Sequence, residues 1–355
     1  MVNDVSDAGD SITSLHIGQS DGEADCEISA DKGPEGLHSA NASAVRTGAN
    51  FISRWANRFS STATETIWLD STLGEWRGKE KIRVDVWRSA QSPESPRLGK
   101  RPAIINFHGG GFVFGEGTDD VRWADALVAG LDAVVFSVNY RLAPTYPFPA
   151  PVEDCIDAIL QIFALGDRYN VEANRIILTG FSVGATLAMS SWIVLQEPKR
   201  WSYQLPSLLP RIAGIVLYCP LLDCTIDRST KREACPRPDL TLPSGLTDLS
   251  DASYLRSVLL QGKRDDLRLS PGLMPAEMLD QLPPIHMCMC EYDMALAEGH
   301  AFEKRMMTGG KPVSVRVVDG ERDAWDKPPP IEPKKSVALE YGKAIELIST
   351  WLGNE

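Results

Sequence analysis

A serine with a glycine two residues away on either side, in Gly180-Phe181-Ser182-Val183-Gly184, carries the clearest chemical signal in this sequence. A strand-like run, RIILT, precedes this motif, and a helix-like run, ATLAMSSWIVL, follows it. Glycines at these positions remove side chains that would clash in a tight strand-to-helix turn, and the helix N-terminus favours negative charge beside the serine. The pattern predicts a nucleophile at Ser182. The competing interpretation is a glycine-rich turn with an incidental serine.

A second glycine-rich stretch, His108-Gly109-Gly110-Gly111, ends the earlier apolar run PAIINF. Residues without side chains let backbone N–H groups point into a site, and together with the amide of Val183 they would hold a developing oxyanion. The competing interpretation is a plain glycine loop beside a structural histidine. We expect His108 itself to be structural, because a loop of this kind acts through its amides.

A carboxylate, Asp293, comes directly after the apolar run IHMCMC. In a sheet of this kind, an acid after the strand that follows an insertion is where a triad carboxylate falls. The other interpretation is a capping residue for the helix predicted near residues 296–308. The two interpretations predict the same turn and differ only in what the side chain contacts.

These residues need a scaffold, and the sequence alternates buried strand-like runs with helices from about residue 65 onward. Helices are predicted near residues 119–130, 296–308 and 334–352. Such alternation indicates a parallel sheet covered by helices on both faces.

The chain divides into four predicted parts. Residues 1–60 are a flexible acidic head followed by a cap helix, in which Phe51, Ile52, Trp55 and Phe59 have helical spacing. Residues 221–283 are too long for an ordinary connection between strands, so we interpret them as an inserted cap. The remaining ranges, 61–220 and 284–355, form the two parts of the core.

Composition narrows the class of protein. The 355 residues are 43% hydrophobic and 24% charged, and the net charge of -12 argues against a nucleic-acid or anionic-membrane surface. The N-terminus lacks the basic and apolar regions of a signal peptide, and no window reaches the roughly 18 apolar residues of a membrane span. We expect a cytoplasmic protein with a small-molecule substrate. Its oligomeric state is open, with a dimer possible.

The seven cysteines are expected to be reduced thiols. Cys288 and Cys290 alternate on a predicted strand and so share one face of it. They lack a partner pair at zinc spacing, which favours small core residues over metal ligands. No metal and no cofactor are expected.

Four motifs occur along the chain in the order of one known family: His108-Gly-Gly-Gly-Phe112, Tyr140-Arg-Leu-Ala-Pro144, Gly180-x-Ser182-x-Gly184, and Asp293 with Glu298-Gly299. Their combination resembles the hormone-sensitive-lipase-like branch of the α/β-hydrolases, which includes many carboxylesterases. The resemblance covers roughly residues 65–352. It implies the α/β-hydrolase fold, with a mostly parallel eight-stranded sheet flanked by helices and a cap.

The resemblance also implies roles for single residues. Ser182 is the implied nucleophile, Asp293 the implied triad acid, and the implied oxyanion donors are the amides of Gly109, Gly110 and Val183.

The sequence departs from this family in two places. The family commonly reads G-D-S-A-G-G at the elbow, whereas Phe181 and Val183 are bulkier here. Related sequences carry the catalytic histidine after the last strand, often before Gly or Ala and then Phe or Trp, and here that stretch is Asp323-Ala324-Trp325-Asp326. The five histidines all lie elsewhere, at His16, His38, His108, His286 and His300. We expect the substrate pocket to be bordered by His108, Phe112, Phe181 and Trp325.

An aspartate in the histidine position changes the expected chemistry. An exposed carboxylate with a pKa near ~4 is a poor base for serine. Beside Asp293, however, Asp323 forms a pair that does not ionise twice easily, so one pKa should rise and the pair can act as acid and base.

We therefore predict an enzyme that acts on the carbonyl, ester or lactone of a mid-sized apolar molecule through Ser182, Asp293 and Asp323. One alternative is a repurposed, non-hydrolytic enzyme of specialised metabolism that catalyses condensation, elimination or cyclisation. The other is a non-catalytic protein that binds a small molecule.

Overall fold

A computed structural model describes residues 42–44, 46–48, 61–89, 99–256, 258, 262–327 and 332–353. The predicted acidic head, and the residues from Phe51 to Phe59 that suggested a cap helix, lie outside the described residues.

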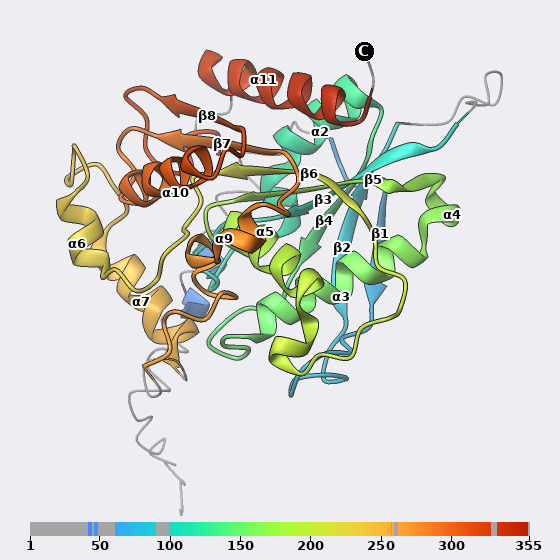
Figure 1. Ribbon diagram of the computed structural model, residues 1–355, viewed down its shortest axis with the longest axis horizontal. Coiled ribbons are helices and arrows are strands. Elements are labelled where there is room, and N and C mark those ends of the chain that lie inside the picture. Colours follow the sequence, from blue (N-terminus) through green and yellow to red (C-terminus); the bar gives the residue numbers. More distant parts are fainter. Residues whose placement is uncertain are drawn as a thin grey trace, which may run out of the picture.

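Eight strands form one sheet at the centre of the molecule (Figure 1). In chain order they are β1 (Glu65–Leu69), β2 (Ile82–Trp87), β3 (Arg101–Phe107), β4 (Val134–Asn139), β5 (Val171–Phe181), β6 (Ile212–Tyr218), β7 (Ile285–Cys290) and β8 (Val313–Val318). Their order across the sheet is β1-β2-β4-β3-β5-β6-β7-β8. Strand β2 is antiparallel to both of its neighbours, and all other pairs are parallel. The predicted mostly parallel, eight-stranded sheet is confirmed.

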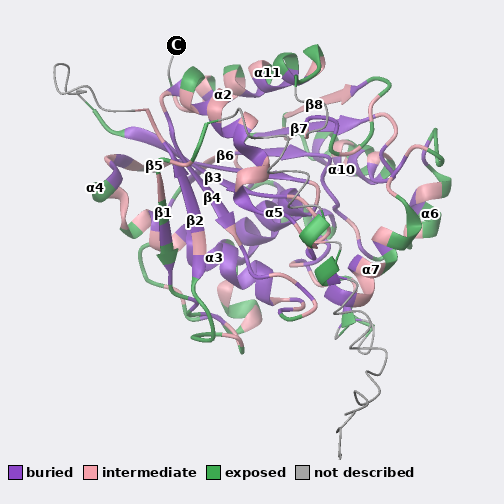
Figure 2. Ribbon diagram, turned by 180° about the vertical axis from the view of Figure 1, so that it is seen from behind, coloured by how far each residue is buried: buried purple, intermediate pink, exposed green. Residues whose placement is uncertain are grey.

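Helices cover both faces of this sheet. One face packs against α2 (Val121–Leu131) and α11 (Lys335–Trp351), and the other against α3 (Ala150–Ala164), α5 (Val183–Gln196) and α10 (Leu296–Thr308). Short helices η1 (Gly117–Asp120), α4 (Gly166–Tyr169) and η2 (Pro198–Trp201) complete the connections. Figure 2 shows inner strands such as β3, β4 and β6 as largely buried, together with helix α5, which packs against the sheet.

The apolar runs of the sequence explain this double burial. Neighbouring residues of a strand point to opposite faces, so Ile104 joins the core beneath α2 and α11 while Ile105 joins the core beneath α3 and α5. Both isoleucines are fully buried. A strand with two covered faces therefore reads as a continuous apolar run rather than an alternating one.

The long segment between β6 and β7 is helical. It contains α6 (Arg228–Glu233), α7 (Ser244–Tyr254), η3 (Pro271–Leu273) and α9 (Ala276–Leu279), and its described residues contain no strand. Figures 1 and 2 place α6 and α7 together at one end of the molecule, away from β1 and α4. Its function as a cap stays a prediction.

Buried contacts fasten this segment to the core. Lys231 on α6 forms a 2.5 Å ion pair with Glu298 on α10, and both side chains are buried. On α7, the hydroxyl of Ser250 donates to the carbonyl oxygen of Gly111 at 2.5 Å. The ring of Tyr254 stacks on Phe112 with 3.6 Å between centroids. The segment is thus fixed at both the glycine loop and α10.

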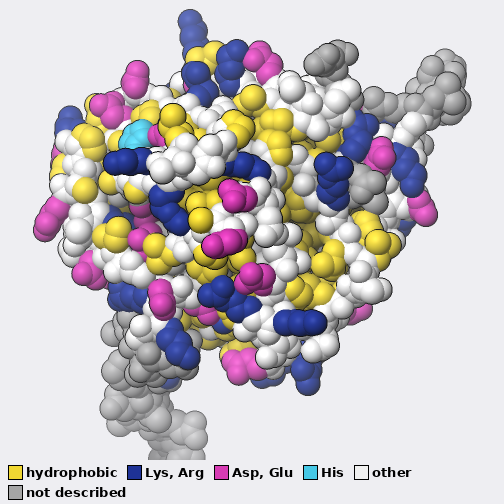
Figure 3. All heavy atoms as spheres, viewed as in Figure 1, with side chains coloured by type: hydrophobic (Ala, Val, Ile, Leu, Met, Phe, Trp, Pro, Cys, Tyr) yellow, Lys and Arg dark blue, Asp and Glu magenta, His cyan; other side chains and the backbone are white. Residues whose placement is uncertain are grey.

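Charge of both signs is spread over the surface. Figure 3 shows acidic and basic side chains interspersed on one face, with hydrophobic side chains across its middle. Within the described part of the chain, no helix combines the length and apolar character needed to cross a membrane.

Candidate active site

Ser182 lies on a strained turn between β5 and α5. Its φ of 52° and ψ of −120° are unfavourable for a residue with a side chain, and its amide donates to the Tyr218 carbonyl oxygen at 2.7 Å. A Cβ on Gly180 would lie 2.3 Å from the backbone of Gly184, and one on Gly184 would lie 2.0 Å from the Phe107 carbonyl oxygen. The turn predicted from the sequence is present, because only glycines fit on both sides of the serine.

The glycine loop after β3 is equally crowded. Gly110 has a φ of 113°, and a Cβ there would lie 2.2 Å from the Phe114 carbonyl oxygen. Gly111 has a φ of 60°, which also favours glycine. Backbone, rather than side chains, therefore forms the wall of the site on this side.

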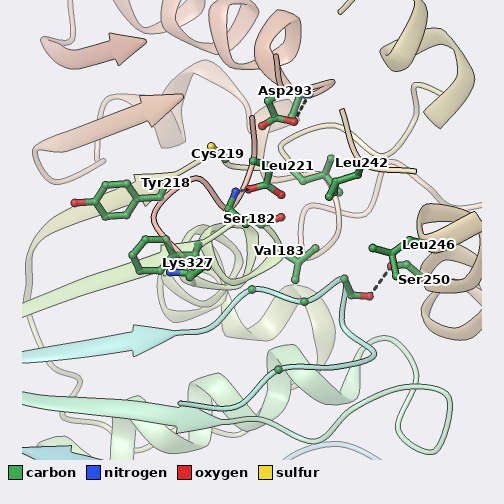
Figure 4. Close-up of a pocket in the computed structure, with 18 of the residues that line it drawn as sticks. Ser182, Val183, Tyr218, Cys219, Leu221, Leu242, Leu246, Ser250, Asp293 and Lys327 are labelled. Atoms are coloured by element: carbon green, nitrogen blue, oxygen red, sulfur yellow. Dashed lines mark hydrogen bonds between the residues drawn. The ribbon is translucent and has the colours of Figure 1, made fainter. Parts of the chain in front are cut away.

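A cavity of about 290 Å³ opens beside Ser182 (Figure 4). Its volume is at the lower end of the range for small-molecule sites. The walls come from the glycine loop, the serine turn, the loops after β6, β7 and β8, and helices α6 and α7. The described lining includes Gly109, Gly110, Phe181, Ser182, Val183, Tyr218, Cys219, Leu221, Leu242, Leu246, Asp293, Met294, Asp323, Trp325, Asp326 and Lys327.

Two of the residues expected at the pocket are not among its described lining. The ring of His108 stacks on Tyr140, with 4.3 Å between centroids, and its Nδ1 lies 2.7 Å from the Gly109 carbonyl oxygen. Phe112 turns into the core and stacks on Tyr254. The prediction that His108 and Phe112 border the pocket is wrong, because aromatic stacking draws both rings away from it, whereas Phe181 and Trp325 do line it.

Asp323 lies at the cavity wall, in hydrogen-bonding reach of the Ser182 hydroxyl. It is half-buried. Its Oδ1 also accepts a hydrogen bond from the Ala324 amide at 2.8 Å. Burial raises the pKa of Asp323, while the hydrogen bond from Ser182 opposes that rise. The loop after β8 therefore presents a carboxyl group, and not an imidazole, to the serine.

Asp293 lies in the loop after β7 and is only 4% exposed. Its Oδ1 accepts a hydrogen bond from the Ala295 amide at 3.0 Å, just before α10 begins. Burial raises the pKa of Asp293 well above its ordinary value, and the nearby Asp323 raises it further. The sequence-based prediction attributed such a shift to carboxyl repulsion alone, whereas burial is the larger cause. The side chain both touches the helix entrance and faces the cavity, so the two interpretations of Asp293 are not exclusive.

Lys327 also lines the cavity, and no pattern in the sequence singled it out. Its Nζ lies 2.6 Å from Asp120 and 2.6 Å from Asp326, and 3.2 Å from the centre of the Phe181 ring. Burial alone would lower the pKa of Lys327, but the two carboxylates raise it above its usual value. A cation therefore stands directly beside the serine turn (Figure 4).

Among the described residues, no histidine lines the cavity. His286 is fully buried in β7, with its Nδ1 3.0 Å from the Ser314 hydroxyl, and burial lowers its pKa to about 4. His300 lies on α10, where its Nδ1 is 2.9 Å from Glu303. Neither ring is available to Ser182.

The cysteines near the site are buried thiols. The Sγ atoms of Cys219 and Cys290 lie 3.3 Å apart, and burial raises the pKa of Cys290 to about 11. Across the described ranges, no three His, Cys, Asp or Glu side chains are grouped so that they could hold a metal ion.

Comparison with known proteins gives one family match and many relatives. The sequence model of a family described as alpha/beta hydrolase fold matches residues 104–325. Esterase LipI of Mycobacterium tuberculosis is 27% identical over 240 residues, which cover 63% of this chain and 65% of that protein. An arylesterase of Saccharolobus solfataricus is 27% identical over 224 residues, covering 62% of this chain and 67% of that protein. The match to the first three curated relatives spans 59–65% of their length.

Solved structures share the fold. An alpha/beta hydrolase from the metagenome of Lake Arreo superimposes with a TM-score of 0.73 and 22% identity, covering 89% of this chain and 92% of that one. An esterase of Pyrobaculum calidifontis gives a TM-score of 0.70 and 24% identity, covering 88% of this chain and 93% of that one.

Proposed function

This chain belongs to the alpha/beta hydrolase fold family, and from that premise we propose that it is an esterase-class enzyme acting on the carbonyl group of an ester or lactone. One observation carries the proposal. The hydroxyl of a serine on a strained turn faces a cavity and a carboxyl group, Asp323, that can take its proton. Curated relatives named esterase and arylesterase support the same class of reaction.

The proposed reaction has two halves. Ser182 Oγ bonds to the carbonyl carbon as its proton passes to Asp323, and the resulting oxyanion is held by the amides of Gly109, Gly110 and Val183. The tetrahedral intermediate then collapses, the ester C–O bond breaks, and Asp323 returns the proton to the leaving alcohol. Water then attacks the acyl carbon as its proton passes to Asp323. The bond between that carbon and Ser182 Oγ breaks, Asp323 returns the proton to Oγ, and the acid is released.

The cavity supports a mid-sized apolar substrate. Leu221, Leu242, Leu246 and Met294 line it, and all three leucines come from the segment between β6 and β7 that carries α6 and α7. Apolar walls favour a hydrocarbon portion of the substrate, while the few polar groups orient its carbonyl.

Hydrolysis of p-nitrophenyl acetate and butyrate tests this function. We expect measurable hydrolysis by the unmodified protein and its loss in Ser182→Ala, with the fold checked by circular dichroism. Equal hydrolysis by the two proteins would contradict a nucleophilic role for Ser182. Labelling of Ser182 by a fluorophosphonate should be slow at neutral pH, because no histidine of the described residues lines the cavity to activate the hydroxyl.

A second function is favoured by one observation, the pair of carboxyl groups at one cavity with raised pKa values. A carboxylic acid and a carboxylate side by side can move a proton on a carbon next to a carbonyl without any covalent intermediate. Deuterium uptake from D₂O into a cyclic ketone, followed by NMR, would separate the two functions. Proton exchange that persists in Ser182→Ala would favour this non-hydrolytic reaction, and exchange lost with the serine would favour the esterase.

A further inference from the structure

Lys327 joins three segments that are distant in the sequence. Its ammonium group contacts Asp120 at the start of α2, Asp326 in its own loop, and the face of the Phe181 ring beside the serine. The other face of that ring stacks on Tyr218, with 4.5 Å between centroids. An ammonium has three N–H donors, so two carboxylates and one aromatic face occupy all of its directions.

Both carboxylates are fixed by the core. Asp120 accepts a hydrogen bond from Asn106 on β3 at 2.7 Å, and Asn106 in turn accepts one from Thr179 on β5 at 2.7 Å. Asp326 accepts a hydrogen bond from the Tyr341 hydroxyl of α11 at 2.7 Å. Lys327 therefore links the loop that carries Asp323 to the sheet, through Asp120 and Asn106, and to α11, through Asp326 and Tyr341.

The two carboxyl groups at the cavity have different neighbours. Asp323 faces two hydrogen-bond donors, the Ser182 hydroxyl and the Ala324 amide, and the cation of Lys327. The groups that oppose its negative charge are Asp326 in the same loop and Asp293 after β7. The thiols of Cys219 and Cys290 are near as well, but their raised pKa values keep them uncharged.

Asp293 has fewer neighbours that stabilise a negative charge. It accepts a hydrogen bond from the Ala295 amide, and two acidic groups, Asp323 and Glu298, lie near it. The nearest lysine, Lys231, forms a 2.5 Å ion pair with Glu298 and not with Asp293, just as Lys327 is paired with Asp120 and Asp326. Asp323 is half-buried and accepts hydrogen bonds from the Ala324 amide and the Ser182 hydroxyl, whereas Asp293 is 4% exposed and accepts one from the Ala295 amide. A negative charge is therefore better accommodated at Asp323 than at Asp293.

We propose that Lys327 is a positioning residue, which fixes Asp323 against Ser182 and keeps it as the ionised member of the pair, so that the proton resides on Asp293. This inference rests on the proposed function in assigning Asp323 as the proton acceptor. It goes beyond that function by giving the order in which the two carboxyl groups lose their protons, and by naming the residue that sets this order.

The first test needs no turnover. The side-chain carboxyl carbons of aspartate are labelled with ¹³C, their NMR signals are assigned with Asp323→Asn and Asp293→Asn, and their pH titrations are followed. We expect Asp323 to titrate at lower pH than Asp293 in the unmodified protein. Lys327→Met should raise the pKa of Asp323, because it removes the nearby cation, whereas Lys327→Arg should restore the original order.

Lys231→Met is the matched control, because it removes a second buried, ion-paired lysine that does not contact the cavity. It should leave the titration of Asp323 unchanged. An unchanged Asp323 titration in folded Lys327→Met, or an equal shift in Lys231→Met, would overturn the inference.

Lys327→Met leaves two carboxylates near each other without their cation, and it can therefore fail to fold. In that case, Asp326→Asn is compared with the double variant Lys327→Met, Asp326→Asn, since asparagine keeps an acceptor for Tyr341. The pKa of Asp323 should be higher in the double variant than in Asp326→Asn. Equal pKa values in the two proteins would count against the inference.

The second test uses ester hydrolysis. In Lys327→Met, the pH at which kcat/KM falls on the acid side should move upward, and kcat/KM at pH 6 should fall about tenfold or more. A residue with only a structural role would lower the amount of folded enzyme without moving this pH profile. An unmoved profile in folded enzyme would therefore count against the inference. If the NMR order is as expected and no ester is hydrolysed, the proposed function fails and the inference about the proton survives.

Discussion

The loops after β7 and after β8 each bring an aspartate to the same cavity, and each has a buried lysine close by. Near the loop after β7, the lysine is Lys231 of α6, which forms an ion pair with Glu298. Glu298 also accepts hydrogen bonds from two backbone amides. In the loop after β8, Lys327 is paired with Asp120 and Asp326, lies over the ring beside the serine, and favours the ionised form of Asp323. Identical residue types therefore receive different electrostatic surroundings. If Asp323 is the proton acceptor, its surroundings, and not its residue type, distinguish its role from that of Asp293.

The largest expected effect comes from Asp323→Asn. If Asp323 accepts the serine proton, kcat/KM for a p-nitrophenyl ester should fall by about 10² to 10⁴, the usual contribution of a positioned general base. The measurement is initial rates at pH 7 with titrated, folded enzyme. Activity within threefold of the unmodified protein would mean that Asp323 is not the base.

Asp323→His should change the same activity in the opposite direction. An imidazole with a pKa near ~6.5 is a better base than a carboxylate, so hydrolysis of short acyl esters should increase about 10²-fold or more. The double variant Asp323→His, Ser182→Ala is the control, and it should lose the gain. A histidine variant that folds without any gain would indicate that the cavity no longer accepts a simple ester.

The ion pair between α6 and α10, which lies near Asp293, should affect stability rather than activity. Lys231→Met leaves Glu298 buried without its cation, and we expect the free energy of unfolding to fall by about 3 kcal/mol. Replacing Glu298 with Met at the same time should recover much of that loss. Urea unfolding at pH 7 measures both changes, and a single variant as stable as the unmodified protein would mean that the ion pair contributes little.

The smallest change in activity is expected for Asp293→Asn. Asparagine resembles a protonated aspartate and keeps an acceptor for the Ala295 amide, so kcat/KM should fall less than tenfold. A loss as large as that of Asp323→Asn would remove the proposed difference between the loops.

Asp293 should also affect how stability depends on pH. Its pKa is raised in the folded protein, so the folded state holds a proton that the unfolded chain has already lost, and stability falls as pH rises through that raised pKa. The asparagine introduced by Asp293→Asn cannot ionise, so this variant should lose less stability between pH 5 and pH 8. Urea midpoints at the two pH values measure this difference.

The fold was predictable because its signals are local and strong. The helix expected near residues 296–308 is α10 (Leu296–Thr308), and the one expected near 334–352 is α11 (Lys335–Trp351). Buried strands are visible in the sequence as apolar runs. A run such as PAIINF can be identified as a strand without knowing which strands lie beside it.

The site was only partly predictable, for a physical reason. The serine turn and the glycine loop are local patterns, but the ion pair between Asp120 and Lys327 joins residues more than 200 positions apart. Only the order of strands in the sheet brings them together. The error over His108 and Phe112 has the same origin, because the partners that turn their rings inward, Tyr140 and Tyr254, are far along the chain.

The crowding at Gly180 and Gly184 has an evolutionary meaning. Any side chain at either position would meet backbone at 2.0–2.3 Å, so a change there requires the sheet and α5 to move apart. Asp323 lies in a loop with cavity space beside it, where one side chain can replace another without disturbing the fold. Residue 323 can therefore change by point substitution while the turn that carries Ser182 stays fixed. If Asp323 is the proton acceptor, the base can be exchanged without rebuilding the turn that holds the serine.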